Sequence, residues 1–256
     1  MMESYLLVAA AALGAILGSF INALSYRFNT GRGMGGRSYC DTCGHTLGVA
    51  DLVPIISYLY LRGKCRHCGA RISIQNPIVE IIAAGTSLLI WQAYAAPVPY
   101  LFWLLVWMTL LFVVVYDLRH TIIPWSCSGL LAALAIASLF INFDTLSLAL
   151  PSLYAVLAGP VLALPLFLIS LVSAGRWMGW GDSGLELSIG WFLGLSLGAS
   201  ALMLAFWSGA LLGIALILVK KGLKMNSELP FAPFLVFGMF LAYFLHVDFF
   251  SIVSFW

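Results

Sequence analysis

Two aspartates are the residues of this chain most suited to chemistry. Asp117 ends one long apolar stretch, and Asp182 opens another, where it follows Gly179 and Gly181 in a Gly-Trp-Gly-Asp segment. Two carboxylates brought within a few ångström do not both ionise readily, so they share a proton; one then activates a water while the other polarises a carbonyl. Asp117 and Asp182 are therefore a candidate catalytic pair for hydrolysis of peptide bonds without a metal or cofactor.

Each aspartate also has a structural interpretation. Asp182 could cap the helix that it opens, and Asp117 could pair with Arg119 or mark the end of a helix. The glycines fit a site, because Gly179 and Gly181 would let an extended substrate backbone approach and would delay the start of the helix until Asp182.

Two further polar residues lie close to the aspartates in sequence. Glu186 follows Asp182 by one helical turn on the same face, so it either tunes the pair or meets a polar partner on a neighbouring helix. His120 either orients Asp117 or lies at the membrane interface.

Four cysteines form a second candidate site, in two Cys-x-x-Cys-Gly units separated by 21 residues: Cys40, Cys43, Cys65 and Cys68. This spacing is typical of a zinc ribbon, in which four thiolates complete a tetrahedron and leave no open position. We predict a structural zinc ion. The alternatives are two disulfides or four unmodified thiols. His45 and His67 are interpreted as solvated loop residues, and Cys127 as a small packing residue.

The composition places these residues in a membrane protein. Of 256 residues, 62% are hydrophobic and only 9% are charged, and the mean hydropathy is +1.04, whereas soluble domains are about 45–50% apolar and about 25% charged. A water-soluble fold is excluded, and a net charge of +2 gives no reason to expect nucleic acid as a partner. The first apolar segment lacks the basic start of a signal peptide and is predicted to be a permanent span.

We predict an all-α polytopic protein with eight transmembrane helices. The spans cover residues 5–24, 78–94, 99–117, 125–142, 152–173, 183–197, 201–219 and 230–247, with a break at Gly198 to Ser200. This topology places every Lys and Arg on one side, which the positive-inside rule makes cytoplasmic, together with both aspartates. The predicted domains are a first helix (1–24), a cytoplasmic zinc-binding loop (25–77) and a seven-helix membrane domain (78–256).

The loop over 25–77 is too short to build a hydrophobic core unaided, so the zinc ion is expected to hold it together. Within it, Ser57 to Leu61 and Ala70 to Ile74 alternate around small and polar residues, which predicts short strands or turns.

Several motifs occur in an order that resembles the prepilin peptidases, the type IV leader peptidase group of intramembrane aspartic proteases. The resemblance covers nearly the whole chain and is carried by these segments: Gly18-Ser19-Phe20-Ile21-Asn22, Arg27, the paired cysteine units, Ser57-Tyr58, Leu61-Arg62-Gly63-Lys64-Cys65, Pro77-Ile78-Val79-Glu80, Asp117 with Ile123-Pro124, and Gly179-x-Gly181-Asp182.

The resemblance implies a bacterial cytoplasmic (inner) membrane enzyme that cuts type IV prepilin or pseudopilin-like precursors after a glycine, with Asp117 and Asp182 as catalytic residues. It also implies methylation of the new N-terminus from S-adenosylmethionine. Asn22 and Glu80 are candidate cofactor contacts, although Glu80 could instead accept backbone donors at the start of a helix. Membrane lipid is the other expected partner.

Three positions depart from the family pattern. Gly184 stands where a lysine is common, Trp125 where an acidic residue follows Ile-Pro, and Asp41 where the first cysteine pair often has proline. All proposed catalytic and metal residues are retained. Two other functions fit the residues alone: an ion-coupled transporter that uses both aspartates as cation or proton sites, or a zinc-bearing membrane scaffold without catalysis.

Overall fold

The computed structural model describes residues 2–29, 36–143, 147–219 and 230–250, and it is mostly helical, as predicted. The chain divides into two compact units, residues 1–115 and 116–256, and the helix α4 (Pro97–His120) crosses the division. Arg32, Asp144, Lys220, Lys221 and Lys224, which enter the predicted charge topology, lie outside the described residues.

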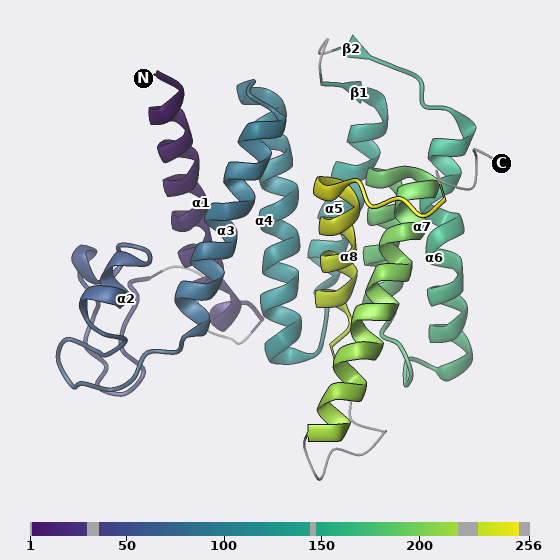
Figure 1. The fold of residues 1–256 in the computed structure, drawn as a ribbon. Helices are drawn as coiled ribbons and strands as arrows, with labels where there is room; N and C mark the ends of the chain where they lie inside the picture. The colour runs from purple at the N-terminus through teal and green to yellow at the C-terminus, as the bar shows by residue number, and fades with distance from the viewer. Residues whose placement is uncertain (1, 30–35, 144–146, 220–229, 251–256) are drawn as a thin grey trace. The chain divides into compact units, whose positions relative to one another are not determined.

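The first unit is built on two helices that lie side by side, α1 (Met2–Arg27) and α3 (Gln75–Ala93) (Figure 1). Glycine makes their contact close, because a Cβ atom at Gly14 would lie 2.5 Å from the Ala83 carbonyl oxygen. The buried Ser87 hydroxyl donates a hydrogen bond to the Ala10 carbonyl at 2.6 Å. Through this packing the end of α1 and the start of α3 meet, which brings the Asn22 amide to the Asn76 carbonyl at 3.1 Å.

The segment between α1 and α3 contains little regular structure: the 3-10 turn η1 (Val49–Asp51), the short helix α2 (Ile56–Tyr60) and two isolated bridges. One bridge joins Tyr39 to Thr46 and the other joins Lys64 to Arg71. Of the short strands or turns predicted over 57–61, no strand is found: residues 56–60 form α2, and a turn follows at Leu61. Over 70–74 the structure has only the Lys64–Arg71 bridge.

In the described residues, the second unit contains the end of α4 followed by α5 (Trp125–Phe140), α6 (Leu153–Ser173), α7 (Trp180–Val219) and α8 (Ala232–Leu245). Strands β1 (Ile141–Asn142) and β2 (Ser147–Leu148) pair antiparallel, with Ile141 opposite Leu148. The contact between α6 and α7 is again made by glycine, since a Cβ at Gly190 would lie 2.9 Å from the Gly159 Cα.

The helix α7 is interrupted at Gly194, which has φ 76° and ψ −178°. A Cβ atom at Gly198 would lie only 3.5 Å from the Gly190 Cα, whereas eight residues of straight helix span about 12 Å. The chain therefore folds back here, and its second arm is the long light-green helix in Figure 1. The break predicted at Gly198 to Ser200 is wrong by several residues, because the positive φ is taken up by Gly194.

Four helices of the described chain are long and apolar enough to cross a membrane: Ser4–Arg27, Pro97–His120, Leu153–Ser173 and Trp180–Val219. The helices α5 and α8 are apolar but shorter. The membrane character is thus confirmed in its coarse form, while the number of eight spans and the sidedness stay predictions.

Candidate active site and metal centre

The Gly-x-Gly-Asp segment forms the N-terminal turn of α7. The helix begins at Trp180, two residues earlier than expected, and Asp182 Oδ2 accepts a hydrogen bond from the Gly179 N–H at 3.0 Å. The Ser170 hydroxyl of α6 donates to the Gly179 carbonyl at 3.3 Å and fixes the turn from outside. Asp182 therefore caps the start of α7, which confirms the capping interpretation. The capping bond uses Oδ2 and does not involve Oδ1.

Gly181 packs against the segment that follows Asp117. A Cβ atom at Gly181 would lie 2.6 Å from the Ile123 Cβ, a separation that real side chains do not adopt. The space beside Gly181 is thus filled by Ile123, which is buried. Glycine here allows the start of α7 to pack against the Ile123-Pro124 turn, only six residues after Asp117, and this contact links the positions of the two aspartates.

Asp117 lies near the C-terminal end of α4 and is only 4% exposed. Its Oδ2 accepts a hydrogen bond at 3.3 Å from the backbone N–H of Ala232, the first residue of α8. The Asp117 carboxylate is therefore oriented by the first residue of α8. The ring of His120 lies against Tyr116, with ring centroids 4.3 Å apart.

The second unit brings the two aspartates into one electrostatic environment. Asp182 is 7% exposed, and the charge of Asp117 acts on it. Each carboxylate accepts one backbone N–H. Both acids are thus buried in one unit, where each makes ionisation of the other harder.

Glu186 is completely buried, one turn beyond Asp182. Neither of its carboxylate oxygens has a hydrogen-bond partner among the described residues, so the polar neighbour expected from the sequence is not found there. Of the positions that depart from the family pattern, Gly184 faces Ser128, where an added Cβ would make an ordinary 3.7 Å contact, and Trp125 is 74% exposed.

The four cysteines of the first unit converge. The sulfur atoms of Cys40, Cys43, Cys65 and Cys68 all lie within 4.8 Å of one another, and those of Cys40 and Cys68 are 3.8 Å apart. Zinc–sulfur bonds of about 2.3 Å in a tetrahedron place sulfur atoms about 3.8 Å apart, so the cluster fits a zinc ion.

The two cysteine units share one backbone geometry. The N–H of Gly44 donates to the Cys40 carbonyl at 2.9 Å, and the N–H of Gly69 donates to the Cys65 carbonyl at 3.0 Å. Both glycines have φ 69°, which confirms the reason for a glycine after each pair. The N–H groups of Cys43 and Thr42 lower the pKa of the Cys40 thiol to about 6, which favours the thiolate that binds a metal.

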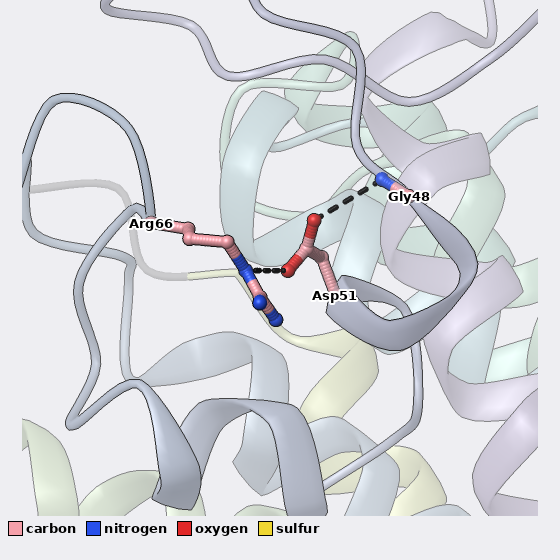
Figure 2. A network of polar contacts seen from close by, with 3 residues as sticks. All are labelled: Gly48, Asp51 and Arg66. Carbon is pink, nitrogen blue, oxygen red and sulfur yellow. Dashed lines mark hydrogen bonds and ion pairs between the residues drawn. The ribbon is translucent and has the colours of Figure 1, made fainter.

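The other candidate ligands behave as predicted. All five cysteines are free of disulfides, and Cys127 is buried in α5. His45 and His67 are exposed and stack on each other with ring centroids 3.5 Å apart, outside the group of ligand atoms. Sequence reasoning missed the link shown in Figure 2, in which Asp51 accepts from the Gly48 N–H at 3.1 Å and from Arg66 Nε at 2.8 Å. It joins η1 to the second cysteine unit.

Asn22 and Glu80 both line a cleft of about 200 Å³ in the first unit. Among the described residues, the lining includes the cation Arg27 and three acidic side chains: Asp41, Asp51 and Glu80. Three tyrosines contribute rings: Tyr26, Tyr39 and Tyr58. Carboxylates and aromatic faces attract cations, so the lining suits a positively charged small molecule such as the sulfonium of S-adenosylmethionine. The cleft is smaller than a typical whole-cofactor site and would hold part of one.

The chain is similar to known proteins over most of its length. Residues 12–94 match the model of the bacterial peptidase A24 N-terminal domain. The chain is 35% identical over 247 residues to the prepilin leader peptidase/N-methyltransferase of Bacillus subtilis, covering 95% of this chain and 94% of the relative. It is 31% identical to the Dichelobacter nodosus protein of that name, over 80% of this chain and 70% of the relative. No solved structure matches the chain significantly.

The fold and the comparisons together define an enzyme class, that of membrane peptidases with a four-cysteine loop. Within that class, the chain belongs to the prepilin leader peptidase/N-methyltransferase family.

Proposed function

We propose that the chain is a membrane aspartic endopeptidase that removes the basic leader from type IV prepilin-like precursors after a glycine. The observation that carries the proposal is the buried pair of Asp117 and Asp182, each oriented by one backbone N–H. The family relatives are named for prepilin leader cleavage, which supports the choice of substrate.

In the proposed mechanism the two aspartates share one proton. The ionised carboxylate takes a proton from water as the water attacks the scissile carbonyl, and the protonated carboxyl donates a hydrogen bond to the carbonyl oxygen. The backbone N–H groups of Gly179 and Ala232 each bind one carboxylate oxygen, Oδ2 of Asp182 and Oδ2 of Asp117, and in this mechanism the other oxygen of each acid would act on water and substrate. Collapse of the intermediate expels the amine, which receives a proton from the pair.

The position of both acids at helix ends supports this mechanism. Asp117 lies three residues before the end of α4, and Asp182 lies in the first turn of α7. We place them at the cytoplasmic face of a bacterial inner membrane, where water reaches them without crossing hydrocarbon and the basic leader remains in the cytoplasm.

We propose a second activity, N-methylation of the newly exposed N-terminus, for the cleft lined by Asn22 and Glu80. S-adenosylmethionine would supply the methyl group as an electrophilic sulfonium. The carboxylate of Glu80 and the ring of Tyr58 would face this cation, while the four cysteines hold the surrounding loop on a structural zinc ion.

One experiment tests both activities. The purified protein is incubated with a prepilin-like peptide, with and without S-adenosylmethionine, and product masses are read. Cleavage after glycine is expected in both cases and a further methyl group only with the donor. Asp117→Asn and Asp182→Asn should each abolish cleavage and leave membrane insertion intact. Normal cleavage by either variant would refute the assignment of the two aspartates as the catalytic pair.

A further inference from the structure

Glu80, which lines the cleft, binds a backbone group that is distant in sequence. Its Oε2 accepts a hydrogen bond from the backbone N–H of Ile55 at 2.7 Å, across 25 residues of sequence. Glu80 belongs to the first turns of α3 and is only 7% exposed, and it also lines the cleft. This bond uses Oε2 alone, so Oε1 is the carboxylate oxygen that does not take part in it.

The backbone of Ile55 is strained. It has φ 63° and ψ −52°, and the Ile56 N–H donates to the Pro54 carbonyl at 2.6 Å. These values define a γ-turn of the rare positive-φ type. Positive φ is a genuine outlier for a β-branched residue, and such strain persists only where the surroundings impose it, commonly at ligand sites.

The strained turn fixes the direction of α2. The helix starts immediately after Ile55, and its less exposed residues, Ser57 and Tyr58, line the same cleft as Glu80. Its other face is open, with Ile56 66% exposed and Tyr60 78% exposed. The open face supplies little packing to hold α2, so the bond from Ile55 to Glu80 is the contact best placed to do so.

We propose that Glu80 is a positioning residue whose two oxygens have different tasks: Oε2 holds the strained turn at Ile55, so that α2 forms a wall of the cleft, and Oε1 receives a cationic ligand. The ligand class rests on the second activity proposed above, the sulfonium methyl donor. Glutamate suits both tasks, because only a carboxylate offers one acceptor to the backbone and a second, negatively charged one to the ligand.

Substitutions separate the two tasks. Glu80→Gln keeps an acceptor for Ile55 and loses the negative charge, whereas Glu80→Ala loses both. Ile55→Gly removes the strain, because glycine adopts positive φ freely. Ile56→Gly is the matched control, since it places the same change one residue later, at an exposed helical position without strain.

Hydrogen exchange of residues 53–60 measures the first task, in the zinc-loaded protein. Losing a hydrogen bond to a charged group should speed exchange in Glu80→Ala about ten- to hundredfold, and leave Glu80→Gln within about twofold of the unsubstituted protein. In the Ile55→Gly background the effect of Glu80→Ala should shrink, because the turn no longer needs holding; in the Ile56→Gly background it should persist. Unchanged exchange in Glu80→Ala would overturn the first task.

Calorimetric binding of S-adenosylmethionine measures the second task. Glu80→Gln should bind about tenfold more weakly, and Ile56→Gly should bind normally. Equal affinity of Glu80→Gln and the unsubstituted protein would overturn the ionic contact. The proposed N-methylation is tested separately. If the unsubstituted protein never methylates a cleaved peptide, the proposed methyltransferase activity is wrong. The hydrogen-exchange rates of residues 53–60 still decide whether Glu80 holds the turn at Ile55.

Discussion

Gly181→Ala is the substitution that tests the packing of the aspartate pair most sharply. The added Cβ would lie 2.6 Å from the Ile123 Cβ, about 1 Å closer than the 3.5–4.0 Å of ordinary carbon contacts. Ile123 is buried, and the overlap involves its Cβ, so no rotation of its side chain removes the clash. The start of α7 and the turn after Asp117 must therefore move apart by about 1 Å.

Gly181→Ala should lower activity much more than it lowers stability. Overpacking of this kind costs about 1–3 kcal/mol, which a membrane helix bundle can absorb without unfolding. A displacement of about 1 Å between catalytic groups lowers a rate by about 100-fold. We therefore expect Gly181→Ala to remain folded and to lose about two orders of magnitude in kcat for leader cleavage.

The assay is leader cleavage in detergent or vesicles, with thermal stability measured on the same samples. The control is Gly184→Ala on the same helix, where the added Cβ meets Ser128 at an ordinary 3.7 Å and cleavage should stay normal. Combining Gly181→Ala with Ile123→Gly should restore part of the rate, whereas Ile123→Ala should not, because it keeps the clashing Cβ. Wild-type kcat in Gly181→Ala, or an equal loss in Gly184→Ala, would refute the reasoning.

Three further predictions concern other parts of the chain. Cys68→Ser should lower the zinc content from about one per chain, measured by metal analysis, because a tetrahedral site without its fourth thiolate binds weakly. The Asp51 carboxyl should titrate by NMR below its ordinary pKa of about 3.9, because the Gly48 N–H, and then Arg66, stabilise the carboxylate; Arg66→Leu should raise the midpoint only part of the way. The loop stability due to Asp51 is then present above the ordinary pKa and is lost as the pH falls through the lower, folded value. Gly194→Ala should destabilise the protein by about 1 kcal/mol or more in thermal unfolding, although the space beside Gly194 is open, because its φ of 76° strains any side chain.

The sequence was most informative where chemistry depends on residue type and short spacing. The cysteine units could be predicted because two Cys-x-x-Cys-Gly turns need only local geometry, and both glycines adopt the expected positive φ. The helices followed from long apolar runs. The capping bond of Asp182 was also local, since its donor is three residues away.

Contacts between distant residues could not be read in this way. The sequence suggested that Gly181 leaves room for substrate, but the structure fills that space with Ile123, a neighbour defined only by packing. The reversal of α7 depends on which glycine adopts positive φ, and the sequence offered both Gly194 and Gly198. The bond between Glu80 and Ile55 joins a helix to a γ-turn for which a β-branched residue gives no sequence signal.

The two aspartates differ in when their orienting groups become available. Asp182 receives its N–H from Gly179, which is synthesised three residues earlier, whereas Asp117 receives its N–H from Ala232, 115 positions later. During translation Asp182 therefore has its orienting group at once, whereas Asp117 gains its own only after α8 has been made. On the proposed mechanism, a chain that stops before Ala232 carries both acids but can orient only one of them.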